Sequence, residues 1–149
     1  MRPMWQKKTM DNLTADEFYQ TLKLRIDTFV VEQNRIYHEL DENDPKAIHV
    51  FYQENVKQPA LAYARIFENG DHVTFGRVVT ASEARGTGLG NQLMTQILAV
   101  CQENWPTQTI EIESQEQVVG FYEKFGFTAI GQPFIFEGTP HVTMHREAK

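Results

Sequence analysis

The sequence is poor in cysteine and contains no long apolar run. Cys101 is the only cysteine in 149 residues, which excludes an internal disulfide and any zinc site built from several thiolates. A lone thiol suits a reducing compartment, so we expect a cytoplasmic protein. No apolar run approaches the roughly 20 residues that a membrane-spanning helix needs, and residues 1–10 lack the apolar stretch of a signal peptide. We therefore expect neither membrane association nor export.

Positive charge is also scarce. Asp and Glu total 20 against 14 Lys and Arg, which gives a formal net charge of -6. Such a field repels nucleic-acid phosphates, so we expect no nucleic-acid partner and favour a cationic one. Repeats and Pro/Gly/Ser-rich linkers are absent as well, and the length suits a single domain over residues 1–149.

Apolar residues at helical spacing predict three helices. They span residues 14–30, about 90–104 and 114–126. Thr14 with Glu17, and Ser114 with Gln117, have the spacing of a capping box, and Gly126 is placed to end the third helix after about three turns. We expect the first helix to bury an apolar stripe. Its members are Phe18, Leu22, Ile26, Phe29 and Val30.

Alternating and β-rich segments between the helices predict strands. They are residues 49–53, 60–67, 72–80, 109–113, 134–136 and 141–144, with a weaker signal at 5–9. Asn69-Gly70 favours a hairpin, and Glu137-Gly138 favours a second turn. Because helices and strands are interspersed, we expect an α/β (α+β) fold with a mixed sheet and helices on both faces.

A glycine-rich turn joins a predicted strand to a predicted helix. It reads Arg85-Gly86-Thr87-Gly88-Leu89-Gly90. Its glycines allow backbone conformations and a close approach that a Cβ would obstruct, so consecutive N–H groups can converge on phosphate oxygens at the helix N-terminus. Arg85 can add a fork of donors. Glycine used only for turn geometry is the alternative interpretation.

Three phosphate-binding patterns compete for this turn. A Walker A loop is excluded, because no Gly-Lys-Ser/Thr follows. A dinucleotide fingerprint needs G-x-G-x-x-G, whereas this turn reads G-x-G-x-G in the middle of the chain. Glu111 or Glu113 could still bind a ribose, so a protein that binds NAD or ATP stays open. The third pattern, R/Q-x-x-G-x-G/A, fits residues 85–90.

With that pattern the sequence resembles the GCN5-related N-acetyltransferase (GNAT) family, in which this loop binds the pyrophosphate of acetyl-CoA. Residues 121–127, Phe-Tyr-Glu-Lys-Phe-Gly-Phe, look like the family's F-Y-x-x-x-G-F segment. A further set is similar to the ElaA-like subgroup. It comprises residues 29–33, Tyr37, Glu39, Asp41, Asp44, His49, Pro140, His141 and Met144.

The resemblance implies the GNAT acyl-CoA N-acyltransferase fold, with a mostly antiparallel sheet and a strand that splays from its neighbour. It implies direct transfer of an acetyl group from acetyl-CoA to a primary amine of a small molecule or peptide. The backbone of Val78 and Val79 would pair with the pantetheine arm, and Leu89 would pack under the cofactor. Tyr122 matches the position whose phenol is the general acid in many members. A role in packing alone is the alternative for Tyr122.

An alkylammonium acceptor must lose a proton before it attacks, so a base or a water relay is useful. The candidates are Glu32, Glu39, Asp41, Asp44, His49 and His141. The subgroup resemblance favours Glu39 and His49 as catalytic residues. Glu32, Tyr37, Asp41 and His141 are expected to contact the acceptor. The acidic stretch 32–44 suits a cationic acceptor, and a solvated acidic loop is the alternative.

Other chemistries are less well supported by the sequence. Cys101 is expected to be a core thiol rather than an acyl-carrying nucleophile, since it shares a helix face with Ile97 and Val100. Arg77 is expected to face outward from its strand. No tight ligand spacing supports a metal site. A non-catalytic acyl-CoA-binding or sensor module remains a rival, and a homodimer remains possible.

Overall fold

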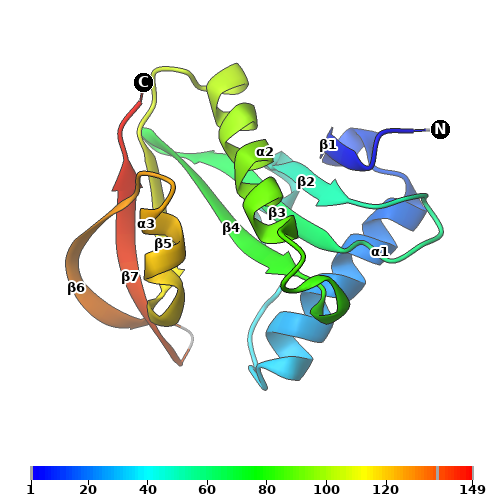
Figure 1. Cartoon of the computed structure of the whole chain (residues 1–149), viewed down its shortest axis with the longest axis horizontal. Coiled ribbons are helices and arrows are strands. Elements are labelled where there is room, and N and C mark those ends of the chain that lie inside the picture. The colour runs from blue at the N-terminus through cyan, green and yellow to red at the C-terminus, as the bar shows by residue number, and fades with distance from the viewer. Residues whose placement is uncertain (1, 137, 149) are drawn as a thin grey trace.

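A seven-stranded sheet forms the centre of the computed structural model, which describes residues 2–136 and 138–148 (Figure 1). Its order is β1-β2-β3-β4-β5-β7-β6, and the one parallel pairing within these residues is that of β4 with β5. The strands are β1 Trp5–Thr9, β2 Ile48–Tyr52, β3 Ala62–Asn69, β4 His72–Thr80, β5 Ile110–Gln115, β6 Thr128–Phe136 and β7 Thr139–Arg146. The mixed, mostly antiparallel sheet confirms the predicted fold. Of the predicted turn between β6 and β7, Glu137 lies outside the described residues.

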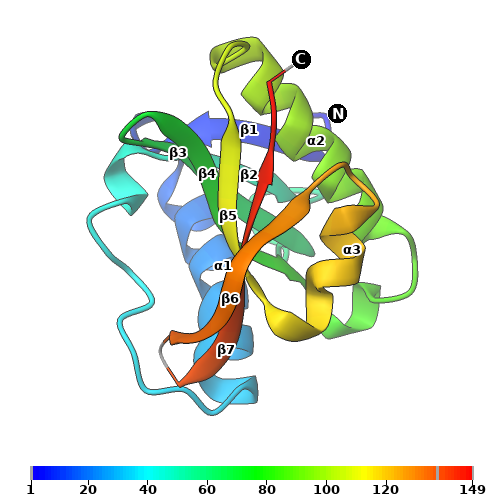
Figure 2. The same ribbon diagram turned by 90° about the vertical axis from the view of Figure 1, so that its left-hand side faces the viewer.

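Helices cover both faces of the sheet, as Figure 2 shows, with α2 and α3 on one side and α1 on the other. The helical elements are η1 Met10–Asn12, α1 Ala15–Arg25, the π-helical η2 Ile26–Glu32, η3 Asp44–Lys46, η4 Ser82–Ala84, α2 Leu89–Asn104, η5 Glu116–Val118 and α3 Val119–Glu123. No helix within residues 2–136 and 138–148 combines the length and apolarity needed to cross a membrane.

Alternate side chains of the central strands enter two separate cores, because successive residues of a strand point to opposite faces. Ala64 and Ile66 pack with α2 in the larger core, whereas Tyr63 packs with Phe29 in the smaller core on the α1 side. Cys101 is buried in the larger core, and burial raises the pKa of its thiol to about 12. Its predicted role as a core thiol is confirmed.

The strands β4 and β5 meet at one end and separate toward the other. Val73 pairs with Ile110, and the Val73 N–H donates to the Thr109 carbonyl at 3.0 Å. Beyond this point β4 continues alongside β3, and β5 continues alongside β7, so the two strands diverge (Figure 1). The divergence leaves two unpaired strand edges facing each other.

A β-bulge lies in β4 next to this gap. Tyr63 pairs with Val79 and Arg65 pairs with Gly76, so two residues of β4, Arg77 and Val78, oppose one residue of β3. Arg77 adopts a φ of +54°, in the left-handed region that residues other than glycine seldom occupy. The bulge therefore re-aims the Arg77 side chain.

The first helix begins as predicted, but the expected apolar stripe is largely wrong. Thr14 and Glu17 form the complete capping box. The buried face of α1, however, is polar and consists of Glu17, Thr21 and Arg25, while Ile26 is 36% exposed. Burial of these charges is tolerable because each has partners, such as Lys8 at 2.8 Å from Glu17.

The third helix is shorter than predicted, and its capping box does not form. Ser114 lies inside β5, and its hydroxyl donates to the Gln115 carbonyl at 2.9 Å. Pairing of β5 with β7 holds Ser114 opposite Val142 and keeps it extended. Only the 3-10 turn η5 and the five residues of α3 remain helical, although the predicted stop at Gly126 is present with a φ of +89°.

Candidate active site

A cleft of about 1180 Å³ occupies the gap between β4 and β5. Its walls come from both strands, from η2 and the loop that follows it, from the start of α2, from α3 and from β7. Several predicted site residues line it: Glu32, Tyr37, Asp41, Val78, Val79, Arg85, Gly90, Tyr122 and His141. Others do not line it: Glu39, His49 and Leu89 are buried, and Gly86, Thr87 and Gly88 are exposed.

The glycine turn leads from the end of β4 into the N-terminus of α2. Gly86 and Gly88 have φ values of +83° and +85°, and a Cβ added to either would meet nothing within 4 Å. The glycines are therefore required by the backbone conformation, and open space lies beside them. No hydrogen bond within the described residues occupies the N–H groups of residues 86–88. These features fit a phosphate-binding turn.

Two neighbours of this turn differ in their environment. Arg85 donates to the Thr80 carbonyl at 3.3 Å and lies 3.3 Å from Glu32, in a pair about half exposed to solvent. A pair so exposed can be exchanged for a phosphate at small cost. Leu89 instead packs into the core with Leu93. It supports the turn from beneath.

Tyr122 lies in the cleft wall with its ring packed among aromatic side chains. It is 7% exposed, and its ring centroid lies 5.9 Å from Phe75 and 6.0 Å from Phe127. Its hydroxyl makes no hydrogen bond to a described residue, and the oxygen is not among the fully buried polar atoms. The hydroxyl is therefore accessible from the cleft. Burial raises the pKa of the phenol, which keeps it protonated at neutral pH.

His141 has one ring nitrogen that makes no hydrogen bond to any of the described residues. Its Nδ1 lies 2.8 Å from the Thr139 carbonyl, which can only accept, so Nδ1 carries the proton. In the neutral ring, Nε2 then holds a lone pair. The ring stacks against Phe134 at 6.2 Å and meets Phe136 edge-on at 5.4 Å. This orientation is fixed by packing and leaves Nε2 free to accept a proton in the cleft.

His49 is placed very differently. It is 1% exposed, with Nε2 3.0 Å from the Asp44 carbonyl and Nδ1 2.6 Å from the Tyr63 hydroxyl. Nε2 therefore carries the proton and Nδ1 accepts one from Tyr63. Burial lowers the pKa of His49 and keeps the ring neutral. Both nitrogens are occupied away from the cleft, which does not fit the expected role as a base.

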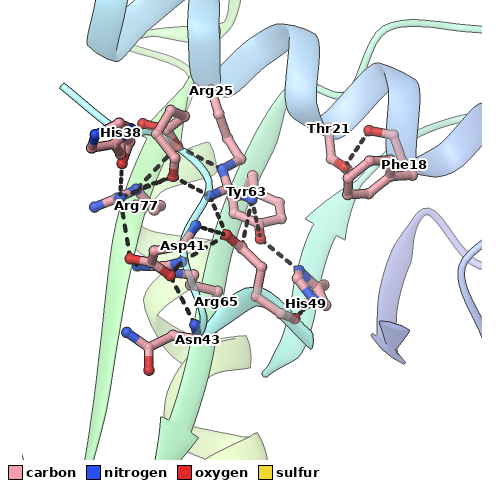
Figure 3. Close-up of polar contacts among 12 residues, drawn as sticks. Phe18, Thr21, Arg25, His38, Asp41, Asn43, His49, Tyr63, Arg65 and Arg77 are labelled. Atoms are coloured by element: carbon pink, nitrogen blue, oxygen red, sulfur yellow. Dashed lines mark hydrogen bonds and ion pairs between the residues drawn. The ribbon is translucent and has the colours of Figure 1, made fainter. Parts of the chain in front are cut away.

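Glu39 belongs to a buried ion-pair network, shown in Figure 3 around Arg25 and Arg77. Its Oε2 accepts from Arg25 at 2.7 Å and from Arg77 at 3.0 Å, and its Oε1 accepts from the Tyr37 hydroxyl. Arg77 also donates to the Glu39 carbonyl at 2.9 Å. The expectation that Arg77 faces outward is wrong, because the bulge turns it toward this carboxylate.

Asp41, which Figure 3 shows beside Arg65, and Asp44 complete the network. Arg65 binds both oxygens of Asp41, at 2.7 and 2.8 Å, and lies 3.0 Å from Asp44. Although burial opposes it, these hydrogen bonds lower the pKa of Asp41 to about 2, and Arg25 likewise lowers the pKa of Asp44. Three arginines thus pair with three carboxylates of the acidic stretch. These three carboxylates are therefore neutralised within the fold, and Glu42 is the acid of the stretch that lines the cleft without an ion pair to a described residue.

Sequence reasoning missed the arginines of this network. Arg25 and Arg65 lie within segments that the pattern assigned to an apolar helix and an apolar strand. An arginine at such a position needs a carboxylate partner, and the stretch 32–44 supplies them. Two arginines inside apolar segments, together with one acidic loop, were the sequence signal that could have indicated this buried network.

Comparisons with known proteins agree with this architecture. A family model described as "Acetyltransferase (GNAT) domain" matches residues 11–148. Protein ElaA of Escherichia coli (strain K12) is 34% identical over 148 residues, covering 96% of this chain and 95% of that protein. The crystal structure of Escherichia coli ElaA superposes with a TM-score of 0.89 at 33% identity, covering 96% of this chain and 99% of that one. An acyl-CoA N-acyltransferase from Pseudomonas aeruginosa gives the same TM-score and identity, with 95% and 97% covered.

The fold is that of an acyl-CoA N-acyltransferase, as the splayed mixed sheet, the glycine turn at the start of α2 and the similar solved structures together show. The chain belongs to the GNAT family and, within it, to the ElaA-like subgroup.

Proposed function

We propose that this protein transfers an acetyl group from acetyl-CoA directly to a primary amine of a small molecule or peptide. One observation carries the proposal: the wall of a single cleft contains Arg85 and Gly90, at the two ends of the glycine turn, together with the Tyr122 hydroxyl and the His141 Nε2, neither of which is hydrogen-bonded to a described residue. Membership of the GNAT family supports an acyl transfer at this place.

The residues that would hold acetyl-CoA lie along β4 and the turn that follows. The N–H groups of residues 86–88 and the Arg85 guanidinium would bind its phosphates, while the unpaired edge of β4 at Val78 and Val79 would pair with its pantetheine arm. When bound, acetyl-CoA supplies an acetyl group activated as a thioester. The remaining steps are proton transfers by this chain.

Tyr122 and His141 can divide the two proton transfers. His141 Nε2 takes the proton that the amine loses as its nitrogen bonds to the acetyl carbon, and the Tyr122 hydroxyl protonates the thiolate as the C–S bond breaks. The products are an amide and a free thiol, while His141 is left protonated and Tyr122 deprotonated. Transfer of one proton from His141 to Tyr122 through solvent restores both groups, so atoms and charges balance over the cycle. Donors held at the oxygen where charge develops would add to the rate, and we assign this role to the N–H groups of the bulge, which lies beside the gap between β4 and β5.

Glu39 and His49 receive a different assignment from the one that the sequence favoured. We assign them to the scaffold, since Glu39 binds Arg25 and Arg77 while His49 binds Tyr63 and the Asp44 backbone. The network holds the loop after η2 against the bulge of β4. Glu39 thus acts through the position of Arg77 rather than on the acceptor.

Two measurements test the proposed function. Acetyl-CoA at about a hundred times its dissociation constant should stabilise the fold by roughly 2.7 kcal/mol, a melting shift of about 5–10 °C, and NAD or ATP should do much less. Thiol release on an amine panel should then identify an acceptor. Stabilisation without thiol release from any amine would favour the acyl-CoA-binding module instead.

The role of His141 is tested by His141→Asn, which keeps an N–H donor for Thr139 but lacks a basic nitrogen at the Nε2 position. Turnover should fall by about 10²–10⁴, while acetyl-CoA binding stays intact. His145→Asn, on the same strand but outside the cleft wall, is the matched control and should keep normal turnover. Equal turnover in both variants would remove His141 from the mechanism.

A further inference from the structure

Arg35 enters the cleft wall directly after the end of η2, and its backbone is held there by a Schellman motif. Asn34 has a φ of +53°, its N–H donates to the Val31 carbonyl at 3.2 Å, and the Arg35 N–H donates to the Val30 carbonyl at 3.0 Å. Asn is among the residues that tolerate this left-handed conformation. The position from which the Arg35 side chain departs is therefore fixed.

The Arg35 side chain is also oriented. Its guanidinium lies over the Tyr37 ring, 4.4 Å from the ring centroid, and this face-on contact is a cation–π interaction. Tyr37 is itself held by its hydrogen bond to Glu39 and by Arg77, whose guanidinium lies 5.2 Å from the same ring. The donor fork of Arg35 is consequently presented at a fixed place in the cleft.

The guanidinium of Arg35 makes no hydrogen bond to another residue within the part of the chain that the structure describes. Four arginines line the cleft, and Arg65, Arg77 and Arg85 each pair with a carboxylate. Within residues 2–136 and 138–148, Arg35 forms no ion pair, and its Nε is fully buried without a hydrogen-bond partner. The two terminal nitrogens of Arg35 also make no hydrogen bond to a described residue, and they are not among the fully buried atoms, so their N–H groups are open to a ligand in the cleft.

We propose that Arg35 binds a carboxylate of the acceptor, so that the acceptor is a carboxylate-bearing amine of the amino-acid class. A guanidinium fork matches a planar carboxylate with two parallel hydrogen bonds. Glu42 and Glu113 also line the cleft and form no ion pair within the described part of the chain, so the cleft offers an anion for the ammonium as well. This inference deepens the proposed function and rests on it for the reaction.

An acceptor carboxylate is favoured over a phosphate of acetyl-CoA by the position of Arg35. The glycine turn has its own unpaired N–H groups and its own arginine, Arg85, for phosphates. Arg35 instead belongs to the loop that the buried network fastens to the bulge of β4 through Tyr37 and Arg77. It therefore lies on the segment that adjoins the reacting centre.

The test measures binding first, so that it does not depend on turnover. The protein saturated with CoA is titrated by calorimetry with the L-amino acids and their α-carboxamides as paired probes. At least one acid should bind about tenfold or more tightly than its amide. Arg35→Gln should abolish this preference, and Arg35→Lys, which keeps charge but not the planar fork, should restore part of it. Lys57→Gln, an equal charge change on an exposed side chain, should leave the preference unaltered.

Two outcomes would overturn the proposal. One is that no acid binds more tightly than its amide. The other is that Arg35→Gln weakens acetyl-CoA binding while the preference for acids survives, which would assign Arg35 to a cofactor phosphate. Thiol release on the same panel separates this inference from the proposed function. Selective binding without thiol release leaves the carboxylate site standing and refutes the transferase activity.

Discussion

Replacing Arg25 with methionine should destabilise the protein by about 3 kcal/mol, because two buried carboxylates would lose a shared partner. Arg25 is 1% exposed and donates five hydrogen bonds, two to Glu39, two to Asp44 and one to Tyr63. Breaking a buried pair costs about 3–5 kcal/mol. We expect the lower end, since Glu39 keeps Arg77 and Asp44 keeps Arg65.

Equilibrium urea unfolding measures this change, and a surface pair on the same helix provides the control. Lys23 lies 2.6 Å from Asp27, but the two side chains are 52% and 55% exposed. Lys23→Met should therefore leave the free energy of unfolding nearly unchanged. The slope of the unfolding free energy with urea should be the same in all three proteins, because the surface exposed on unfolding is nearly unchanged.

The cost of Arg25→Met should also depend on pH with a defined sign. Arg25 lowers the pKa of Asp44 below its usual value of 3.8 in the folded state. The stability that this pair contributes is thus present above pH 3.8 and is lost as the pH falls through the folded pKa. The difference between parent and variant should be largest at pH 7 and shrink below about pH 4. A difference under 1 kcal/mol at pH 7, or one that persists undiminished in acid, would refute the argument.

Two further predictions concern the cofactor site and the general acid. Gly88→Val should abolish the stabilisation by acetyl-CoA in a thermal melt. The control is Gly131→Val, which has a similar φ of +73° but lies on β6 outside the cleft wall, and it should lower the stability of the fold by a similar amount and leave acetyl-CoA binding intact. Equal acetyl-CoA binding by both variants would place the phosphate site elsewhere. Tyr122→Phe should retain fold and acetyl-CoA binding but lower single-turnover transfer at least about tenfold, and an unchanged single-turnover rate would leave Tyr122 as a packing residue.

The strands could be predicted closely because their signals are local. The predicted strand 72–80 is found as His72–Thr80, since Asn69-Gly70 fixes the hairpin and the alternation follows from it. The glycine turn and Tyr122 could also be identified from the sequence, because each belongs to a short motif. The start of the third helix could not be predicted in this way. Its capping pattern at Ser114 competes with pairing to Val142, which lies 28 positions further along the chain.

The first helix shows a second way in which local pattern fails. An apolar stripe is the usual buried face of a helix, yet α1 buries Arg25 because Glu39 and Asp44 return to it from a later loop. The helix periodicity contains no information about these partners. Once the ion pairs are formed, the polar face becomes the one that the sheet covers, and Ile26 is left at the surface.

The same pairing decides what kind of acceptor the cleft can attract. A count of charges over residues 32–44 predicts a negative site, but a paired carboxylate has little field left to offer, and Glu39, Asp41 and Asp44 are all paired. Among the described residues that line the cleft, Arg35 and the exposed acids Glu42 and Glu113 carry charges without an ion pair. One positive and two negative groups in the wall of one cleft suit a molecule that carries both signs. A simple alkylamine would leave the Arg35 fork unpaired, so it should be a weaker acceptor than the corresponding amino acid.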